Sequence, residues 1–178
     1  EAVRMSKRTG KAITLSDLLE DVSIDAARFF FNLRMAGSHL DFDLDLAVKQ
    51  DSDNPVYYVQ YAHARICSLI ANLKAEGKEI PEAADLSLLD NSREIELIRH
   101  IAALPKEINL AAKNYDPARI TKYSIDLATL FHRFYDACSV KNAETPELMN
   151  ARILLCLAVR QTLRNALSIL NVEQPEKM

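Results

Sequence analysis

The stretch NPVYYVQYAHARICSLIANLK, residues 54–74, decides the fold of this chain. Asn54 is a residue type that caps helices, and Pro55 suits the first helical position because its missing N–H needs no partner there. Apolar residues then recur at helical spacing, at Val59, Ala62, Ile66, Leu69, Ile70 and Leu73. The pattern predicts an amphipathic helix from near Pro55 to about Lys74.

Three further helices follow by the same reasoning, after a loop over 76–91. One covers about 92–114, and Pro105 should kink or split it because proline lacks the N–H and clashes with the preceding turn. The next starts at Asp116-Pro117, a cap followed by proline, and the last starts at Thr145-Pro146 and runs to about Leu170. The residues expected to face inward are Ile95, Ile98, Ile101, Ala102, Ile108 and Ala112, then Ile120, Tyr123, Leu127, Leu130, Phe131 and Phe134, then Cys156, Val159, Leu163, Ala166, Leu167 and Leu170.

Residues 1–52 differ from this helical part. Thr14, with Asp17 three residues later, predicts a capping box on a short helix, and Asp25 can cap the next one. Segment 39–46, HLDFDLDL, alternates between polar and apolar residues and predicts a half-buried strand or extended stretch. The expected fold class is mainly all-α: a helix bundle over 53–178, preceded by a short α/β segment that ends a different domain at residue 52.

Composition excludes several classes of protein. The chain has 178 residues, 49% of them hydrophobic, and a formal net charge of −3. No run of about 18 apolar residues predicts a membrane span. The three cysteines are far apart and lack zinc-ligand spacing, which favours a reducing cytoplasm and no metal site. Asp41, Asp43 and Asp45 lack the glycine and distal glutamate of a calcium loop, so we interpret them as a solvated strand face.

The net charge averages regions of opposite sign, so it does not exclude nucleic acid. Acidic residues gather at 41–53 and 79–96, whereas 4–11 and 148–172 are basic. Arg4, Lys7, Arg8 and Lys11 surround Ser6, Thr9 and Gly10, a composition that suits a mobile loop closing over phosphates. The alternative is a solvated basic tail.

A second candidate site lies on the first long helix. Tyr57, Tyr61 and Arg65 are spaced i, i+4, i+8, so they line one face away from the apolar stripe. Two aromatic rings and a guanidinium in a row make a platform for unstacked bases, although the rim of a packed helix would show the same pattern. His63 has no nucleophile or carboxylate at local spacing, and we expect a hydrogen-bonded structural role for it.

The last two helices carry a third candidate site. Arg152, Arg160 and Arg164 lie in a stretch, 148–172, that holds no acid, and this favours contact with a polyanion over a solvated face. Arg119, Lys122, His132 and Arg133 add positive or titratable groups to the preceding helix, near Tyr135.

Together these motifs resemble the arginyl-tRNA synthetase family of class I. The resemblance rests on MSKRTG (5–10), LDFDLDL (40–46), DNPVYYVQYAHAR (53–65), AVRQTLRNAL (158–167) and the terminal Met178. It covers the whole chain, and it implies that 53–178 is an anticodon-binding domain of the DALR type, while 12–52 packs against the inner corner of the tRNA.

The resemblance also implies site residues. Residues 1–11 would be the "KMSKS" loop, in which Lys7 matches the second lysine and acts catalytically, while Arg4 and Arg8 replace the first lysine and the final serine. Arg4, Ser6, Lys7 and Arg8 would contact the ATP phosphates. Residues that would contact the anticodon loop are Tyr61, Arg65, Tyr135 and Met178, to which the reasoning above adds Tyr57, Arg160 and Arg164.

The implied partners are arginine-specific tRNA, with ATP, Mg2+ and arginine held through a nucleotide-binding domain that would lie before Glu1. We expect a cytoplasmic protein with no DNA or membrane partner. The chain alone should be inactive and should hold no cofactor. One alternative is a stand-alone RNA-binding helical module without ligase activity, and another is a four-helix bundle that mediates protein assembly.

Overall fold

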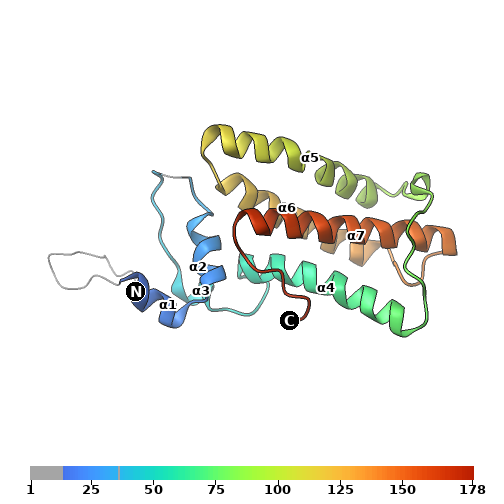
Figure 1. Ribbon diagram of the computed structural model, residues 1–178, viewed down its shortest axis with the longest axis horizontal. Coiled ribbons are helices and arrows are strands. Elements are labelled where there is room, and N and C mark those ends of the chain that lie inside the picture. Colours follow the sequence, from blue (N-terminus) through green and yellow to red (C-terminus); the bar gives the residue numbers. More distant parts are fainter. Residues whose placement is uncertain (1–13, 36) are drawn as a thin grey trace.

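The computed structural model describes residues 14–35 and 37–178, and helices dominate it (Figure 1). In chain order the elements are α1 (Leu15–Asp21), α2 (Ile24–Phe31), α3 (Leu44–Ala47), α4 (Pro55–Ala75), the 3-10 turn η1 (Leu86–Leu88), α5 (Ser92–Asn114), α6 (Ala118–Ala137) and α7 (Pro146–Ile169). The predicted long helices are confirmed within one or two residues at each end.

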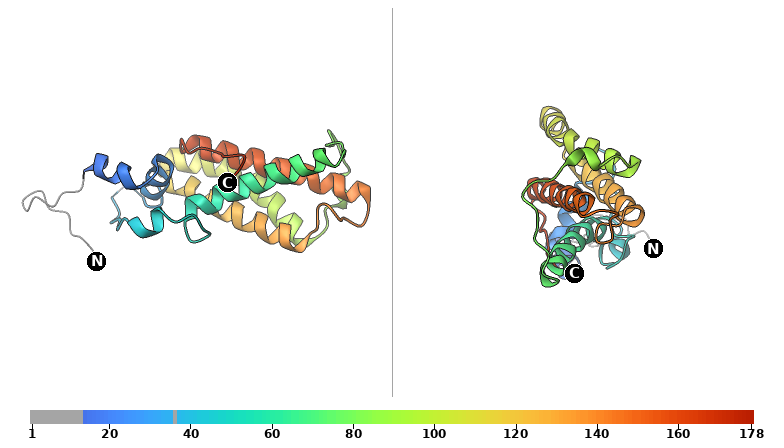
Figure 2. Two further views of the ribbon diagram at one scale, coloured as in Figure 1. Left: turned by 90° about the horizontal axis from the view of Figure 1, so that it is seen from below. Right: turned by 90° about the vertical axis from the view of Figure 1, so that its right-hand side faces the viewer.

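The long helices α4, α5, α6 and α7 run along the length of the molecule and form one bundle (Figure 2). Helices α6 and α7 are its centre, because each of them packs against the other and against both α4 and α5. Phe131 and Phe134 of α6 and Leu163 of α7 are fully buried there. No helix in the described ranges is long and apolar enough to cross a membrane.

The predicted inward faces of α4, α6 and α7 are confirmed, with Leu130 half-buried. The face predicted for α5 is wrong. Ile98 and Ile108 are 39% and 36% exposed, whereas Glu94, Leu97, Leu104 and Ala111 are the buried residues. The buried stripe of α5 therefore includes a charged residue, which Arg152 of α7 neutralises with its Nε 2.7 Å from Glu94 Oε1. Helix α5 continues through Pro105 without being split.

Local capping explains where the helices begin. Thr145 Oγ1 accepts from the Leu148 N–H at 3.2 Å, and Thr14 forms the expected capping box with Asp17. Two predicted caps are wrong. Ser23, rather than Asp25, caps α2, and α6 begins after Pro117 without a side-chain cap from Asp116.

The strand alternative for 39–46 is wrong, because the described residues contain no strand: 39–43 has no regular secondary structure and α3 begins at Leu44, so the expected α/β segment is helical and irregular instead. A strand needs a neighbour to pair its backbone groups, and the described part of the chain provides none. Asp43 instead caps α3, its Oδ1 accepting from the Leu46 N–H at 2.9 Å. Phe42 still faces inward, packing its ring 5.4 Å from that of Phe30.

Candidate nucleic-acid interface

The first half of α4 presents the predicted aromatic face. The rings of Tyr57 and Tyr61 are nearly parallel, with an interplanar angle of 5° and centroids 6.4 Å apart. Tyr61 is 41% exposed, so one side of this pair is open to solvent. The i, i+4 spacing of the two tyrosines brings them together on the helix surface, as the sequence predicted.

Helix α6 completes the site with His132 and Tyr135. The His132 ring stacks on Tyr61 with centroids 5.9 Å apart, and the Arg65 guanidinium carbon lies 4.1 Å from the centre of the Tyr135 ring. A guanidinium above an aromatic face is a favourable cation–π contact that also fixes the plane of the arginine. The structure thus unites four of the predicted residues, Tyr57, Tyr61, Arg65 and Tyr135, in what we name the aromatic cluster, with His132 as a fifth member.

The sequence grouped His132 with the positive or titratable groups of α6 and did not assign it to the aromatic face. Its Nδ1 lies 3.3 Å from Arg65 Nη1, and because arginine can only donate, Nδ1 accepts and Nε2 carries the proton. Burial, assisted by the positive charge of Arg65, lowers the pKa of His132 from its ordinary value. The ring is therefore neutral at physiological pH and can stack as an uncharged aromatic group.

A hollow of about 420 Å³ opens beside the cluster, within the size range of ligand pockets. Its rim includes Gln50, Asp51 and Ser52, which precede α4. Asn54 places this rim, because its buried side chain donates to the Ala47 and Lys49 carbonyls at 3.1 and 2.8 Å while its Oδ1 caps α4. On the far side, Asp136 lies 3.7 Å from Arg65 and leaves the guanidinium only partly neutralised.

Two of the remaining predicted residues, Arg160 and Arg164, lie on another side of α4, near His63. Arg160 and Arg164 are close enough to His63 to affect its charge, and His63 lies on a different face of α4 from Tyr61. Burial, helped by these two arginines, lowers the pKa of His63. Met178 is 50% exposed.

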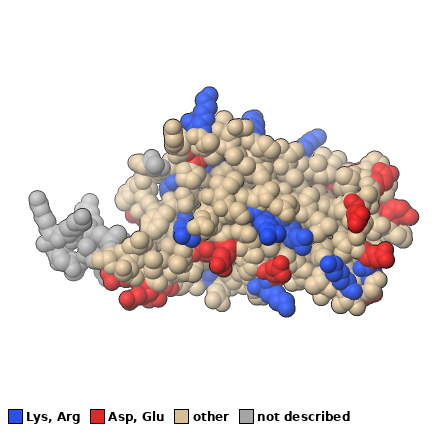
Figure 3. Space-filling view, in the orientation of Figure 1, with Lys and Arg blue, Asp and Glu red and all other residues tan. Residues whose placement is uncertain are grey.

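His63 has the structural role that the sequence predicted. It is 4% exposed, and its Nδ1 donates to the Pro175 carbonyl at 2.9 Å. Arg152, by contrast, is not available to a polyanion, because it pairs with Glu94. Figure 3 shows lysines and arginines spread along this side of the bundle with acidic groups among them rather than as one continuous basic surface.

The predicted phosphate-binding loop, with Arg4, Ser6, Lys7 and Arg8, lies outside the described residues. The structure therefore does not test the roles predicted for these side chains.

Comparison with known proteins identifies the class of domain to which this all-helical bundle belongs. Residues 59–178 match the model of the DALR anticodon binding domain, so the chain belongs to that family.

The sequence corresponds in particular to the C-terminal anticodon-binding region of arginyl-tRNA synthetases. The arginine–tRNA ligase of Caldanaerobacter subterraneus is 56% identical and that of Acetivibrio thermocellus 52% identical, each over 100% of this chain. The chain spans about a third of the length of these relatives, 32% in both cases. A solved structure titled as an arginyl-tRNA synthetase from Campylobacter jejuni superposes with a TM-score of 0.83 at 31% identity, over 97% of this chain and 37% of that one.

Proposed function

We propose that this chain binds the anticodon loop of arginine-specific tRNA as part of an enzyme that joins arginine to that tRNA using ATP. The observation that carries the proposal is the aromatic cluster, an open stack of Tyr57, Tyr61 and His132 beside a guanidinium held over Tyr135, in a chain of an anticodon-binding family. Its ligase relatives match residues 1–52 as well as the helical bundle, which favours the ligase over a stand-alone RNA-binding module.

The cluster suits the chemistry of a loop whose bases are unstacked. Such bases stack on aromatic side chains, and each stacked base contributes about 1–3 kcal/mol. Tyr61 offers the exposed ring, and Tyr57 extends the surface behind it. Arg65, fixed over Tyr135, then presents its remaining N–H groups to a base edge or a phosphate.

Arg160, Arg164 and Met178 form the second part of the proposed interface, on the side of α7 and the chain end. The two arginines would contact phosphates of the same RNA, which predicts that affinity falls steeply with salt. Met178, half-exposed at the chain end, would contact the loop from that side.

The ligase chemistry itself is proposed from the relatives and the sequence. Lys7, with Arg4, Ser6 and Arg8, would spread positive charge over the ATP phosphates and stabilise the departing pyrophosphate, with Mg2+ accompanying the ATP. Arginine would bind in the part of the relatives that this chain does not span. The chain alone should then show no ATP–pyrophosphate exchange, and measurable exchange would refute this part of the proposal. A cytoplasmic location, without DNA or membrane partners, stays a prediction.

Binding of the 178-residue chain to an arginine tRNA transcript tests the RNA-binding proposal. Tyr61→Ala should raise the dissociation constant about 5- to 150-fold, which corresponds to about 1–3 kcal/mol of lost stacking. The control is Tyr115→Gly, because Tyr115 is another exposed tyrosine and precedes the start of α6, which is about 21 Å from His132 along the helix axis. A transcript with a replaced anticodon should bind the unchanged chain weakly. If Tyr61→Ala bound as tightly as the unchanged chain, the anticodon assignment would be wrong.

A further inference from the structure

The chain end folds back over α2 and α4 instead of continuing past α7, and we name residues 171–178 the tail (Figure 1). Asn171 has a φ of 52°, and the Val172 N–H donates to the Leu167 carbonyl at 3.0 Å, which turns the backbone at the helix end. Val172 is 2% exposed and joins the hydrophobic core. The tail therefore starts from a fixed point.

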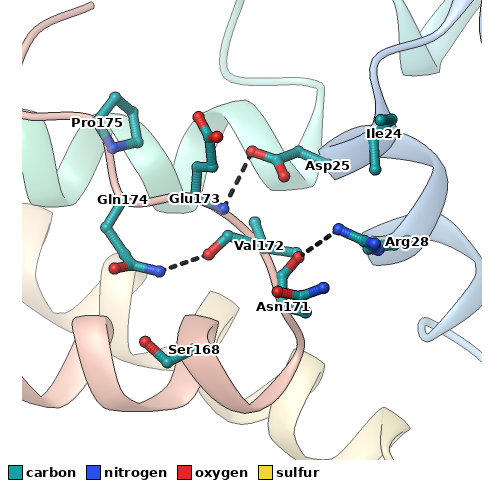
Figure 4. A pocket seen from close by; sticks show the side chains of 9 residues that line it. All are labelled: Ile24, Asp25, Arg28, Ser168, Asn171, Val172, Glu173, Gln174 and Pro175. Carbon is teal, nitrogen blue, oxygen red and sulfur yellow. Dashed lines mark hydrogen bonds between the residues drawn. The ribbon is translucent and has the colours of Figure 1, made fainter.

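The middle of the tail meets α2 and α4 in one group of hydrogen bonds. Asp25 Oδ2 accepts from the Glu173 N–H at 3.1 Å (Figure 4). The same oxygen accepts from Gln60 Nε2 at 2.8 Å. Gln60 Nε2 also donates to the Glu173 carbonyl at 3.1 Å. Asp25 from α2, Gln60 from α4 and the Glu173 backbone therefore hold one another, and we name these three residues the node.

Two more bonds attach the tail on either side of the node. Arg28 Nη1 donates to the Asn171 carbonyl at 3.0 Å, and His63 Nδ1 donates to the Pro175 carbonyl at 2.9 Å. These attachments fall two residues before and two residues after Glu173, so the tail is held on both sides of the node. All of these hydrogen bonds use backbone groups of the tail, so they fix the position of its backbone independently of its side chains.

Asp25 is the charged member of the node, and it does not cap α2. The helix is capped by Ser23 Oγ, which accepts from the Ala26 N–H at 3.1 Å. A carboxylate makes stronger hydrogen bonds than a neutral acceptor does. Asp25 is therefore the residue on which the attachment of the tail to both helices most depends.

We propose that Asp25 is a positioning residue for RNA binding: it holds the tail against α4 so that its free end is already in place when RNA arrives. This inference rests on the proposed function. Ordering a flexible segment costs conformational entropy, and a segment ordered in advance does not take that cost from the binding energy. Without the node, of the bonds to α2 and α4 named above only those from Arg28 and His63 would hold the tail, and RNA binding would have to supply more of the order up to Met178.

The sign of the effect distinguishes positioning from simple electrostatics. Asp25 carries a negative charge, and removing a negative charge near a polyanion should strengthen binding or leave it unchanged. Positioning predicts the opposite, because Asp25→Asn replaces the shared carboxylate oxygen with a weaker or donating group. The matched control is Asp21→Asn, which removes the same charge from an exposed residue at the end of α1.

The experiment measures binding of an arginine tRNA transcript by the full chain and by a chain ending at Val172, each unchanged and with Asp25→Asn. We expect Asp25→Asn to weaken binding about tenfold in the full chain, which corresponds to about 1.4 kcal/mol, and to have no effect in the shortened chain. Asp21→Asn should have no such effect in either. Gln60→Leu, which removes the donors from the α4 side, should repeat the tail-dependent loss.

A second measurement follows the tail without RNA. Hydrogen exchange of the Glu173 amide should accelerate at least about tenfold in Asp25→Asn and stay unchanged in Asp21→Asn. Equal weakening of binding in both chain lengths, or unchanged exchange, would refute the positioning role. Absence of tRNA binding by both unchanged chains would refute the proposed function, whereas binding that Asp25→Asn and Gln60→Leu leave unchanged would refute only the positioning role.

Discussion

Replacing Glu94 with glutamine should destabilise the bundle strongly, because Glu94 carries a charge at a fully buried position. Its side chain is 0% exposed, its Oε1 lies 2.7 Å from Arg152 Nε, and its Oε2 accepts from the Asn91 N–H at 3.0 Å. Arg152 is 12% exposed and also donates to the Ser139 carbonyl at 2.9 Å. This single pair therefore joins the start of α5, helix α7 and the segment that follows α6.

The expected magnitude follows from this burial. Glu94→Gln keeps the shape of the side chain but leaves the Arg152 charge buried without its partner, which costs about 3–5 kcal/mol. For a chain of this size, each kcal/mol lowers the melting temperature by about 2–4 °C, so we expect a decrease of about 10 °C. The matched control is Glu96→Gln on the same helix. The Glu96 side chain is 48% exposed and pairs with Arg93 at 3.2 Å, so its loss should cost less than about 1 kcal/mol.

Urea unfolding followed by circular dichroism, together with calorimetry, measures both changes. Glu94→Leu combined with Arg152→Met should recover most of the lost free energy of unfolding, because it removes both charges and keeps the apolar volume. A loss below about 1 kcal/mol for Glu94→Gln would refute the reasoning. A double variant as unstable as the single one would refute it too, since the cost would then come from packing and not from an unpaired charge.

Three further predictions concern the site, the pH response and one strained turn. Arg65→Lys should weaken tRNA binding about tenfold without changing its salt dependence, because lysine keeps the charge but loses the planar contact with Tyr135; binding at several salt concentrations measures this. The pKa values of His63 and His132 are lowered in the folded chain, so as the pH falls the unfolded chain takes up protons before the folded chain does. The free energy of unfolding should therefore be greatest above about pH 6.5 and should decrease below it. His63→Asn, which keeps a donor for the tail, should flatten that fall in urea unfolding at a series of pH values. Tyr115→Gly should raise the free energy of unfolding by about 1 kcal/mol, because Tyr115 has a φ of 52° and is 89% exposed, and urea unfolding measures it directly.

Helix positions could be predicted from the sequence because the signals that start a helix are local. Asn54-Pro55 and Thr145-Pro146 each combine a side chain that accepts from the first N–H groups with a proline that needs no partner, and both helices begin there. The apolar stripes of α4 and α7 were readable because polar residues clearly separate them from the other faces.

The face of α5 could not be read in this way. Ile95, Ile98 and Ile101 make more than one face of that helix apolar, so the sequence offers several stripes. The structure buries the stripe that contains Glu94. A search for apolar residues alone would not select this stripe, because it contains a charged residue. Burial of Glu94 is favourable because Arg152 of α7 pairs with it, and the sequence of α5 alone does not indicate that partner.

The strand predicted for segment 39–46 was wrong for a related reason. Alternation of polar and apolar residues is typical of a strand, but a strand also requires a neighbour, and the described chain offers none. The aspartates that create the alternation have a local alternative, since Asp43 caps a helical turn.

The candidate site could be predicted where its residues are close in the sequence. Tyr57, Tyr61 and Arg65 follow from helical spacing alone, whereas the contact between Arg65 and His132 joins residues 67 apart. The sequence placed His132 near Tyr135, three residues apart on one helix, but no local signal shows that it also contacts Tyr61 and Arg65 of α4. The node is still less local, because the bond between Asp25 and Glu173 spans 148 residues.

Helix α4 contributes to the aromatic cluster with one face and holds the tail with another, and this makes the two sets of contacts separable. Tyr57, Tyr61 and Arg65 lie on one face, while Gln60 and His63 lie on a face turned well away from it and hold the tail. The two sets contact different neighbours, α6 on one side and α2 with the tail on the other. Substitutions in separate sets of contacts usually have additive effects. If both sets contact the same RNA while α4 stays rigid, Tyr61→Ala and Asp25→Asn should weaken binding by factors that multiply. A double variant that binds much more tightly than the product of the two factors would mean that the tail acts through the aromatic cluster instead of beside it.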